Sequence, residues 1–156
     1  MTSLGQDRRP SMDDPSPKSS STEISARMRR TGRRDTAAEL AIRRELHRRG
    51  YRYRVDQRPS DRMRTRADIL FTRWRVAVFV DGCFWHGCPE HGTAPKANAV
   101  WWREKITANI ARDRRADAAL AAEGWLVVRI WEHEEIPNAV ARVEEALGRR
   151  RADRTE

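Results

Sequence analysis

The sequence predicts an α/β domain in which helices flank a small mixed sheet and one loop holds a structural metal. Helix-like and strand-like segments alternate between about residue 36 and residue 150. Two cysteines and two histidines fall within a single short stretch, residues 83–91. The chain has 156 residues, which is the length of one domain with a core of moderate size.

The chain is strongly basic, and the excess is local. It carries 32 Lys and Arg against 23 Asp and Glu, a net charge of +9. Between Arg27 and Arg66 there are 15 arginines against five acidic residues. Such a surface favours a polyanionic partner, above all nucleic acid. No apolar run approaches 18 residues and no hydrophobic signal core opens the chain, so we expect a soluble cytoplasmic protein without a membrane partner.

The N-terminal third contains a tail, a basic arm and a first helix. Residues 1–24 are rich in Ser, Pro and Asp and lack apolar periodicity, so we predict a disordered tail. Residues 25–34 form a basic arm, which is either a strap across DNA or more of the tail. The segment Thr36-Ala-Ala-Glu39 fits a capping box and predicts a helix that ends before Gly50.

Three short strands are expected next. Residues 51–55 predict a first strand, and a basic loop follows at residues 57–64. Residues 66–71 and 75–80 predict two strands that are joined by a turn. The strand at 75–80 is the more apolar of the two, so we place it at the centre of the sheet.

A long helix is predicted at residues 99–123. Trp102, Ile106 and Ile110 recur four residues apart, which is the spacing of one helical face, and Gly124 ends the segment.

A strand and a helix complete the domain. Residues 125–131 are apolar enough for a strand that is buried on both faces. Residues 137–150 predict a final helix with Pro137 in its first turn, and residues 151–156 form a charged tail.

The Cys/His loop has ligands that zinc prefers. Cys83 and Cys88 are separated by four residues, and His91 follows Cys88 after two more. If the strand at 125–131 lies parallel beside that at 75–80, His133 emerges at the same edge and completes a Cys2His2 site. Structural zinc contributes on the order of 10 kcal/mol to folding. His86 is a rival fourth ligand, and two buried thiols beside exposed histidines are the simpler alternative.

Residues 79–91 read Phe-Val-Asp-Gly-Cys-Phe-Trp-His-Gly-Cys-Pro-Glu-His. This stretch resembles the signature loop of the very-short-patch repair (Vsr) DNA mismatch endonucleases. Other segments agree with that family in the same order, over about residues 25–135: Ser25-x-x-Met28-Arg29, Arg34-Asp-Thr-Ala-x-Glu39, Arg66-Ala-Asp-Ile69, Trp102-x-x-Lys-Ile106, Asn109-x-x-Arg-Asp-Arg114, Gly124-Trp125 and Arg129-x-Trp-Glu132.

The resemblance implies a restriction-endonuclease-like core with structural zinc and catalytic magnesium, over residues 25–150. It implies an enzyme that nicks one DNA strand 5′ to the thymine of a T:G mismatch. Such mismatches arise when 5-methylcytosine deaminates, and the nick starts very-short-patch repair. The implied partner is double-stranded DNA in the bacterial nucleoid, with mismatch-repair proteins as further candidates. The resemblance suggests a monomer.

The resemblance also assigns chemical roles. Asp68 would bind magnesium, with the backbone carbonyl of Val80 as a second protein ligand. His86 would act as the general base, since neutral imidazole accepts a proton near neutral pH. Glu39 and Asp113 match positions near the active centre, although salt bridges on a helix surface explain both equally well.

Six positions match residues through which the family contacts DNA. Three aromatic side chains would insert beside the mismatch, where opening the base stack costs least. By resemblance, the contacts are made by Met28, Phe84, Trp85, Trp102, Lys105 and Asn109.

Two positions depart from the family pattern. Ala67 precedes Asp68 where the family often has proline, which shapes the backbone and not the chemistry. His133 stands where the last zinc ligand is commonly cysteine, and imidazole ligates zinc as well as thiolate does. Asp81 is either an outer-shell group of the magnesium site or part of a simple Asp-Gly turn.

Three other functions are consistent with the residues alone. The first is a nuclease of the same fold that acts on another lesion or as a restriction enzyme. The second is a zinc-stabilised DNA-binding module without chemistry, for which Asp68 and His86 have no purpose. The third is an arginine-rich RNA-binding protein.

Overall fold

The computed structural model describes residues 36–83, 88 and 97–156. In chain order these form helix α2 (Ala37–Arg48), strands β1 (Arg54–Gln57), β2 (Ala67–Phe71) and β3 (Val76–Asp81), helix α3 (Ala99–Ala122), strand β4 (Leu126–Trp131) and helix α4 (Ile136–Asp153).

The four strands form one mixed sheet in the order β1-β2-β3-β4. β1 and β2 pair antiparallel, as do β2 and β3. β4 pairs parallel to β3, from Val76 beside Leu126 to Asp81 beside Trp131. The expected parallel pairing is confirmed, and it brings the C-terminal ends of β3 and β4 to the same edge of the sheet.

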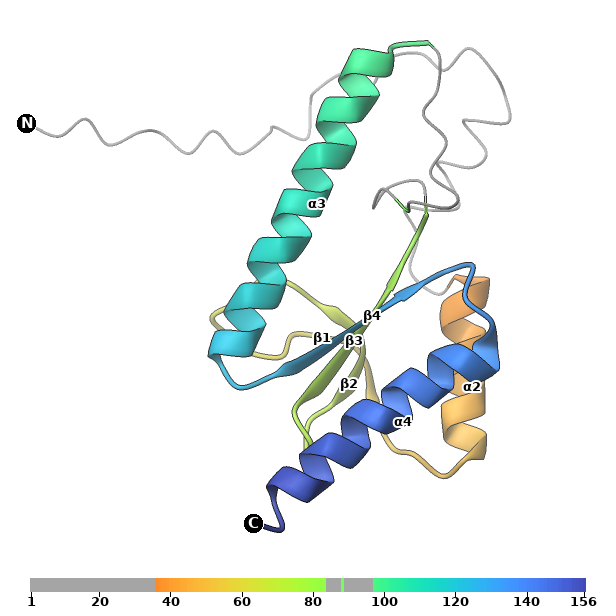
Figure 1. Ribbon diagram of the computed structural model, residues 1–156, viewed down its shortest axis with the longest axis vertical. Helices are drawn as coiled ribbons and strands as arrows, with labels where there is room; N and C mark the ends of the chain where they lie inside the picture. Colours follow the sequence, from red (N-terminus) through yellow and green to blue (C-terminus); the bar gives the residue numbers. More distant parts are fainter. Residues whose placement is uncertain (1–35, 84–87, 89–96) are drawn as a thin grey trace, which may run out of the picture.

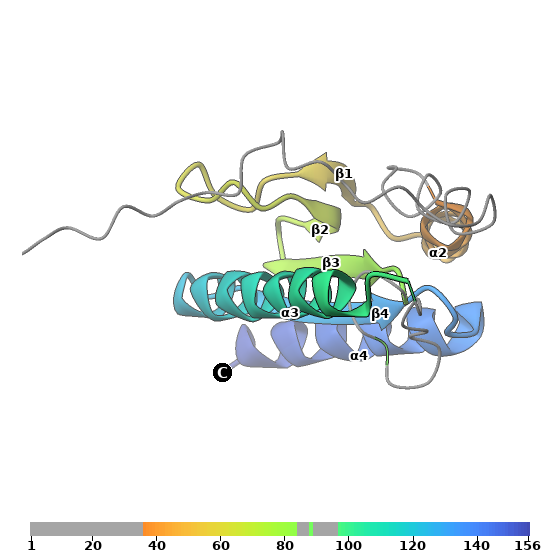
Figure 2. The ribbon, with the colours of Figure 1, turned by 90° about the horizontal axis from the view of Figure 1, so that it is seen from above.

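Helices cover both faces of the sheet, as Figures 1 and 2 show. α2 and α4 pack on one face, where Ile42, Leu46 and Val143 meet Ile69 and other strand residues in the larger core. α3 packs on the other face through Leu120, beside Phe79 and Trp125. The predicted α/β class with a helix-flanked mixed sheet is therefore confirmed.

α2 begins with the predicted capping box. The Thr36 hydroxyl accepts a hydrogen bond from the backbone N–H of Glu39 at 3.3 Å. The Glu39 carboxylate in turn accepts one from the backbone N–H of Thr36 at 3.1 Å. These two bonds satisfy two free donors at the helix start and fix the position of the Glu39 side chain.

β1 begins three residues later than predicted. The two tyrosines of the predicted strand pack their rings edge-to-face against Phe71, with centroids 6.4 Å (Tyr51) and 6.0 Å (Tyr53) away. The ladder to β2 starts only at Arg54, opposite Leu70. The apolar pattern of the predicted strand therefore indicates side-chain packing against Phe71 and not strand pairing. α4 likewise extends to Asp153, past the predicted end at Arg150.

The expectation that the last strand is buried on both faces is confirmed only in part. β4 lies at the edge of the sheet, and only Val128 and Ile130 within it are fully buried. The opposite face carries Arg129, which is half-buried beneath α3. None of the described helices is long and apolar enough to cross a membrane.

Candidate active site

Asp68 lies at the start of β2, beside the end of β3. The backbone N–H of Val80 donates a hydrogen bond to Asp68 Oδ2 at 2.7 Å. The antiparallel pairing of β2 with β3 produces this contact, because it sets the beginning of one strand against the end of the other. The structure thus brings together the two residues that were expected to hold magnesium.

Two further carboxylates converge on Asp68. Glu39 is buried in the first turn of α2 and faces Asp68 closely enough to form a hydrogen bond with it. Asp81, the last residue of β3, is also buried and acts on Asp68 through its charge. It belongs to the strand, so its Asp-Gly step is not a simple surface turn.

This environment raises the pKa of Asp68 to about 8. Burial is the main cause, and the hydrogen bond and charge of Glu39 and the charge of Asp81 add to it, while the bond from Val80 opposes it. Crowded buried carboxylates resist ionisation together. A divalent cation would relieve that repulsion, so the cluster fits a cation site.

Asp68→Asn is expected to stabilise the protein in the absence of magnesium. Unfolded aspartate titrates near pH 3.9, whereas Asp68 in the folded protein titrates at about 8. Between these values the folded state keeps a proton that the unfolded state has released, so the wild-type free energy of unfolding falls as pH rises. The variant lacks this loss. Its advantage in urea unfolding should grow from pH 5 to pH 8, reaching at least about 1 kcal/mol.

Asp153→Asn, an exposed aspartate at the end of α4, is the matched control and should show no such trend. A wild-type protein that is more stable than Asp68→Asn at pH 8 would contradict the raised pKa.

Arg129 joins β3, β4 and α3 through its guanidinium group. Its Nη1 lies 3.1 Å from Asp81 Oδ1 and 3.9 Å from Asp113 Oδ1, and its Nη2 lies 2.7 Å from Asp117 Oδ1. The group also sits over the Phe79 ring, 4.4 Å from the centroid. Asp113 is therefore linked to the carboxylate cluster through Arg129.

The role of Arg129 was not foreseen from the sequence. Burial alone would lower the pKa of Arg129, but its bond to Asp117 and the charges of Asp81, Asp117 and Asp113 raise it on balance. A signal was present nonetheless, because Arg129 is the lone charge in the apolar run Leu-Val-Val-Arg-Ile-Trp. Such a residue is costly within a sheet unless it is paired.

Arg129→Met is expected to lower the free energy of unfolding by about 2 kcal/mol, because three acidic groups lose their common partner in a half-buried site. This estimate lies below the range for fully buried pairs since solvent reaches the group. Arg149→Met is the control: Arg149 pairs with exposed Glu145, at 2.6 Å, and its loss should cost less than about 0.5 kcal/mol. Equal losses in urea unfolding would show that Arg129 contributes no more than a surface pair.

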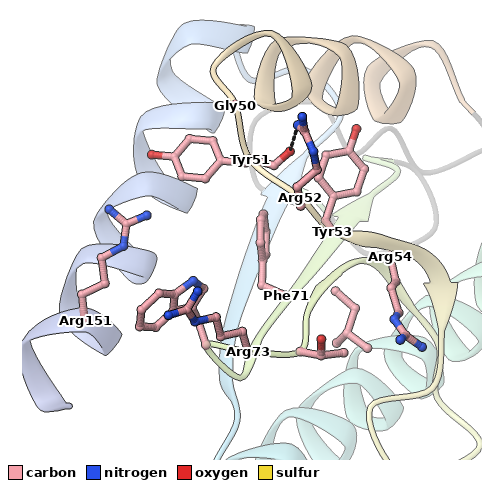
Figure 3. Close-up of a pocket in the computed structure, with 11 residues that line it drawn as sticks. Gly50, Tyr51, Arg52, Tyr53, Arg54, Phe71, Arg73 and Arg151 are labelled. Atoms are coloured by element: carbon pink, nitrogen blue, oxygen red, sulfur yellow. Dashed lines mark hydrogen bonds between the residues drawn. The ribbon is translucent and has the colours of Figure 1, made fainter.

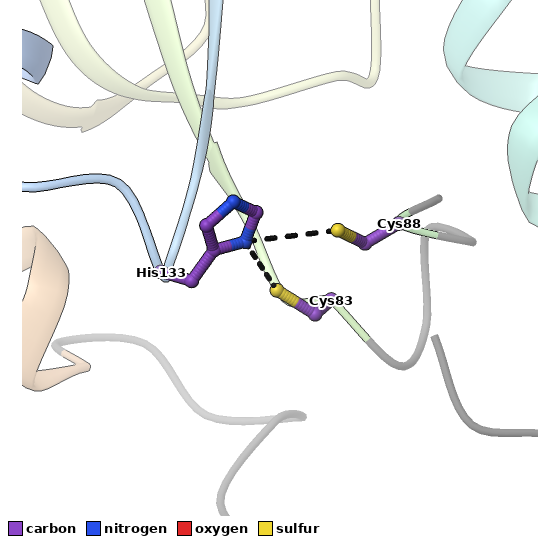
Figure 4. A group of neighbouring side chains, drawn as sticks. All are labelled: Cys83, Cys88 and His133. Atoms are coloured by element: carbon purple, nitrogen blue, oxygen red, sulfur yellow. Dashed lines mark hydrogen bonds between the residues drawn. The ribbon is translucent and has the colours of Figure 1, made fainter. Parts of the chain in front are cut away.

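A candidate metal centre lies next to this cluster. One ligand atom each from Cys83, Cys88 and His133 falls within 4.8 Å of the others. The Sγ atoms of Cys83 and Cys88 lie 3.0 Å and 3.6 Å from His133 Nδ1. Figure 4 shows Cys83 just past the end of β3 and His133 just past β4, with both sulfurs facing the imidazole. The parallel pairing of these strands positions the group.

The thiol of Cys83 holds its proton, which a bound metal would displace. The pKa of Cys83 is raised to about 11 by burial first, and then by the neighbouring Cys88 and the charge of Glu132. The backbone N–H of Cys83 donates to Glu132 Oε1 at 3.2 Å, which ties the loop to the end of β4. Two sulfurs and one imidazole form a donor set suited to zinc.

The expected DNA-contacting residues on α3 differ in exposure. Trp102 is 4% exposed and stacks edge-to-face with Trp101, with centroids 4.6 Å apart. Asn109 is also buried, and its Oδ1 accepts a hydrogen bond from Arg112 at 2.8 Å. Lys105 is half-buried. Five expected site residues lie outside the described part of the chain: Met28, Phe84, Trp85, His86 and His91.

The sequence is similar to a family of DNA mismatch endonucleases and to several nicking enzymes. A family model described as DNA mismatch endonuclease Vsr matches residues 18–91. The type II nicking enzyme V.NaeI of Lentzea aerocolonigenes is 46% identical over 125 residues, which cover 79% of this chain and 75% of that protein. The type II nicking enzyme V.XorIIP of Xanthomonas oryzae is 43% identical over 69% of this chain and 77% of its own length. DNA mismatch endonuclease Vsr of Escherichia coli is 34% identical, over 69% and 68% respectively.

Proposed function

Because the chain belongs to the Vsr family of DNA mismatch endonucleases, we propose that it nicks one strand of duplex DNA 5′ to the thymine of a T:G mismatch. The observation that carries the proposal is the buried carboxylate of Asp68, which is held against Val80 and crowded by Glu39. A binding module would gain nothing from this costly arrangement.

Magnesium fits the carboxylate cluster. Asp68 would hold it directly, with the carbonyl of Val80 as a second ligand, while Glu39 and Asp81 would act from the next shell. When bound, the ion would stabilise negative charge on the phosphate and on the leaving oxygen. Because Asp68 must lose its proton to bind a cation, magnesium affinity should rise with pH up to about 8.

His86 is our proposed general base. It lies three residues after Cys83 and two before Cys88 in the sequence. Its Cα is thus within about 11 Å of that of Cys83, the reach of three extended residues. Cys83 in turn follows Val80 by three residues in the sequence, and the proposed base would accept a proton from water that attacks a phosphate beside Asp68.

We propose that zinc occupies the candidate metal centre, with Cys83, Cys88, His91 and His133 as ligands. The convergence of three of these donor groups supports the assignment. Zinc would anchor both ends of the segment that carries His86 and the aromatic pair Phe84 and Trp85, which would fix them relative to β3.

We propose that the protein selects the mismatch by inserting aromatic side chains into the base stack. Phe84, Trp85 and Trp102 would enter the base stack, while Lys105 and Asn109 contact the mismatched pair and Met28 approaches from the opposite groove. Insertion costs less where pairing is already imperfect, which favours a mismatch over a paired site. Since Trp102 is buried in the absence of DNA, its insertion requires a side-chain rotation or a shift of α3.

The test compares T:G, C:G and T:A duplexes of otherwise identical sequence, each labelled on either strand, with magnesium present. We expect a single nick 5′ to the mismatched thymine and at least 100-fold slower cutting of the paired duplexes. Equal cutting of all three would indicate a nickase that does not discriminate the mismatched pair and recognises the surrounding sequence alone. The names of the type II relatives also allow this specificity. No cutting of any duplex would overturn the proposal.

A further inference from the structure

A cavity of about 490 Å³ lies beside the turn from β2 to β3 (Figure 3). It is bounded by the segment after α2, the turn from β2 to β3 and the last turns of α4. Its lining includes the aromatic residues Tyr51, Tyr53 and Trp74 and the arginines Arg52, Arg54, Arg73 and Arg151. We call it the basic aromatic pocket.

Fixed aromatic rings form one part of the pocket. The hydroxyl of Tyr51 donates to Glu144 Oε1 at 3.1 Å, and that of Tyr53 donates to the backbone carbonyl of Arg43 at 2.6 Å. Both rings pack against Phe71, which is buried beneath them. The pocket therefore offers a preformed aromatic surface whose rings need no ordering when a ligand binds.

Four guanidinium groups surround these rings without an acidic partner. Within the described residues, none of Arg52, Arg54, Arg73 and Arg151 forms a salt bridge, and Arg52 donates only to the carbonyl of Tyr51, at 3.3 Å. By contrast, Arg49 a few residues away pairs with two glutamates. In the described part of the chain, Glu144 is the acidic group that contacts the pocket wall, through the Tyr51 hydroxyl, and no salt bridge neutralises these four arginines.

Two of these arginines stack on Trp74. The guanidinium carbons of Arg73 and Arg151 lie 4.9 Å and 5.4 Å from its ring centroid, and that of Arg154 lies at 5.5 Å. A second hollow of about 280 Å³ shares Arg73 and Trp74 and continues past Arg75. The basic aromatic surface thus extends beyond one cavity.

We propose that the basic aromatic pocket binds single-stranded nucleic acid. Arginine guanidinium groups hold phosphates, and aromatic faces stack bases with little regard to sequence. The pocket volume suits one nucleotide, and the second hollow lies where a neighbouring nucleotide would follow. A duplex is too wide to enter and would present phosphates alone, which would leave the aromatic wall unused.

This pocket is separate from the proposed nicking centre. The pocket lining includes none of the carboxylates of the proposed nicking centre, although its lining residue Leu70 lies two residues from Asp68 along β2. The inference therefore goes beyond the proposed function, and it can be tested in a protein that cannot nick.

The experiment uses full-length Asp68→Asn protein that is saturated with an unlabelled T:G duplex to occupy the nicking centre. A fluorescein-labelled oligothymidylate of eight nucleotides is then titrated, and its anisotropy is followed at several salt concentrations. The test variant adds Arg52→Glu and Arg73→Glu, at two exposed pocket arginines. The control adds Arg44→Glu and Arg149→Glu, which change the charge equally at exposed positions outside the pocket.

The pocket variant should bind the oligonucleotide at least 10-fold more weakly, with the salt slope reduced by roughly 1.4 for two lost phosphate contacts. The control should change affinity less than threefold. Trp74→Ala should weaken binding about fivefold or more, because Arg73 and Arg151 lose the ring that positions their guanidinium groups. An oligonucleotide with 5-iododeoxyuridine should crosslink under ultraviolet light to residues 51–54 or 71–74.

Equal losses in the pocket variant and the control would overturn the proposal, as would crosslinks confined to other segments. Poly-glutamate is added as a competitor at matched charge. If poly-glutamate displaced the labelled oligonucleotide as effectively as unlabelled oligothymidylate does, the pocket would recognise negative charge alone. The nucleic-acid assignment would then be wrong.

Discussion

Asp68→Asn is expected to slow nicking of a T:G duplex on the order of 10³-fold or more, while the affinity for that duplex changes less than threefold. Asparagine keeps the size of the side chain and can still accept the hydrogen bond from Val80. It removes the charge that would hold magnesium beside the scissile phosphate, and a 10³-fold loss corresponds to about 4 kcal/mol of transition-state stabilisation. Single-turnover cleavage with a strand-labelled duplex measures the rate, and anisotropy measures the binding.

Two companion variants sharpen this result. His86→Ala should lose about 10² to 10⁴ in rate, the usual contribution of a general base, and should flatten the acidic side of the pH–rate profile. Asp153→Asn should nick at the wild-type rate. If Asp68→Asn retained wild-type turnover, the carboxylate cluster would not be the reaction centre.

Removal of zinc is expected to have the largest effect on folding. We expect the purified protein to contain about one zinc per chain, and Cys83→Ala or Cys88→Ala to lose it. Loss of the metal should cost several kcal/mol, since binding and folding are coupled at such sites. For a chain of this length a loss of 3 kcal/mol lowers Tm by roughly 6–12 °C. Elemental analysis and thermal unfolding, before and after zinc is added back, measure both quantities.

The histidines separate the ligand role from the catalytic role. His91→Ala should lose zinc and stability together, whereas His86→Ala should keep both and lose only nicking. His47→Ala, at an exposed position on α2, is the control and should change neither. A stable, zinc-free wild-type protein would contradict the assignment, and zinc loss in His86→Ala would reverse the roles of the two histidines.

Much of the fold followed from local sequence patterns. The capping box at Thr36 and the left-handed Gly124, with φ of 85°, mark where α2 begins and α3 ends. The apolar strand before Asp81 is central as predicted, and the parallel alignment of its neighbour brings Cys83 to His133. For the helix ends and the central strand, the determinants lie within a few residues of one another.

Features that depend on residues far apart in the sequence were not predictable. No local pattern shows that β4 is an edge strand, because strand order depends on the whole topology. The link from Arg129 to Asp81 and Asp117 joins three elements. The basic aromatic pocket likewise combines Tyr51, Trp74 and Arg151, which become neighbours only when α4 packs on the sheet.

Two residues, Asp81 and Gly82, separate Val80, whose backbone N–H binds Asp68, from Cys83, whose sulfur faces His133. A change in the position of the thiol pair would therefore shift the backbone N–H of Val80, which orients the Asp68 carboxylate. In a chain whose thiol pair has not bound the proposed zinc, we expect the alignment of Asp68 to weaken together with the stability of the fold.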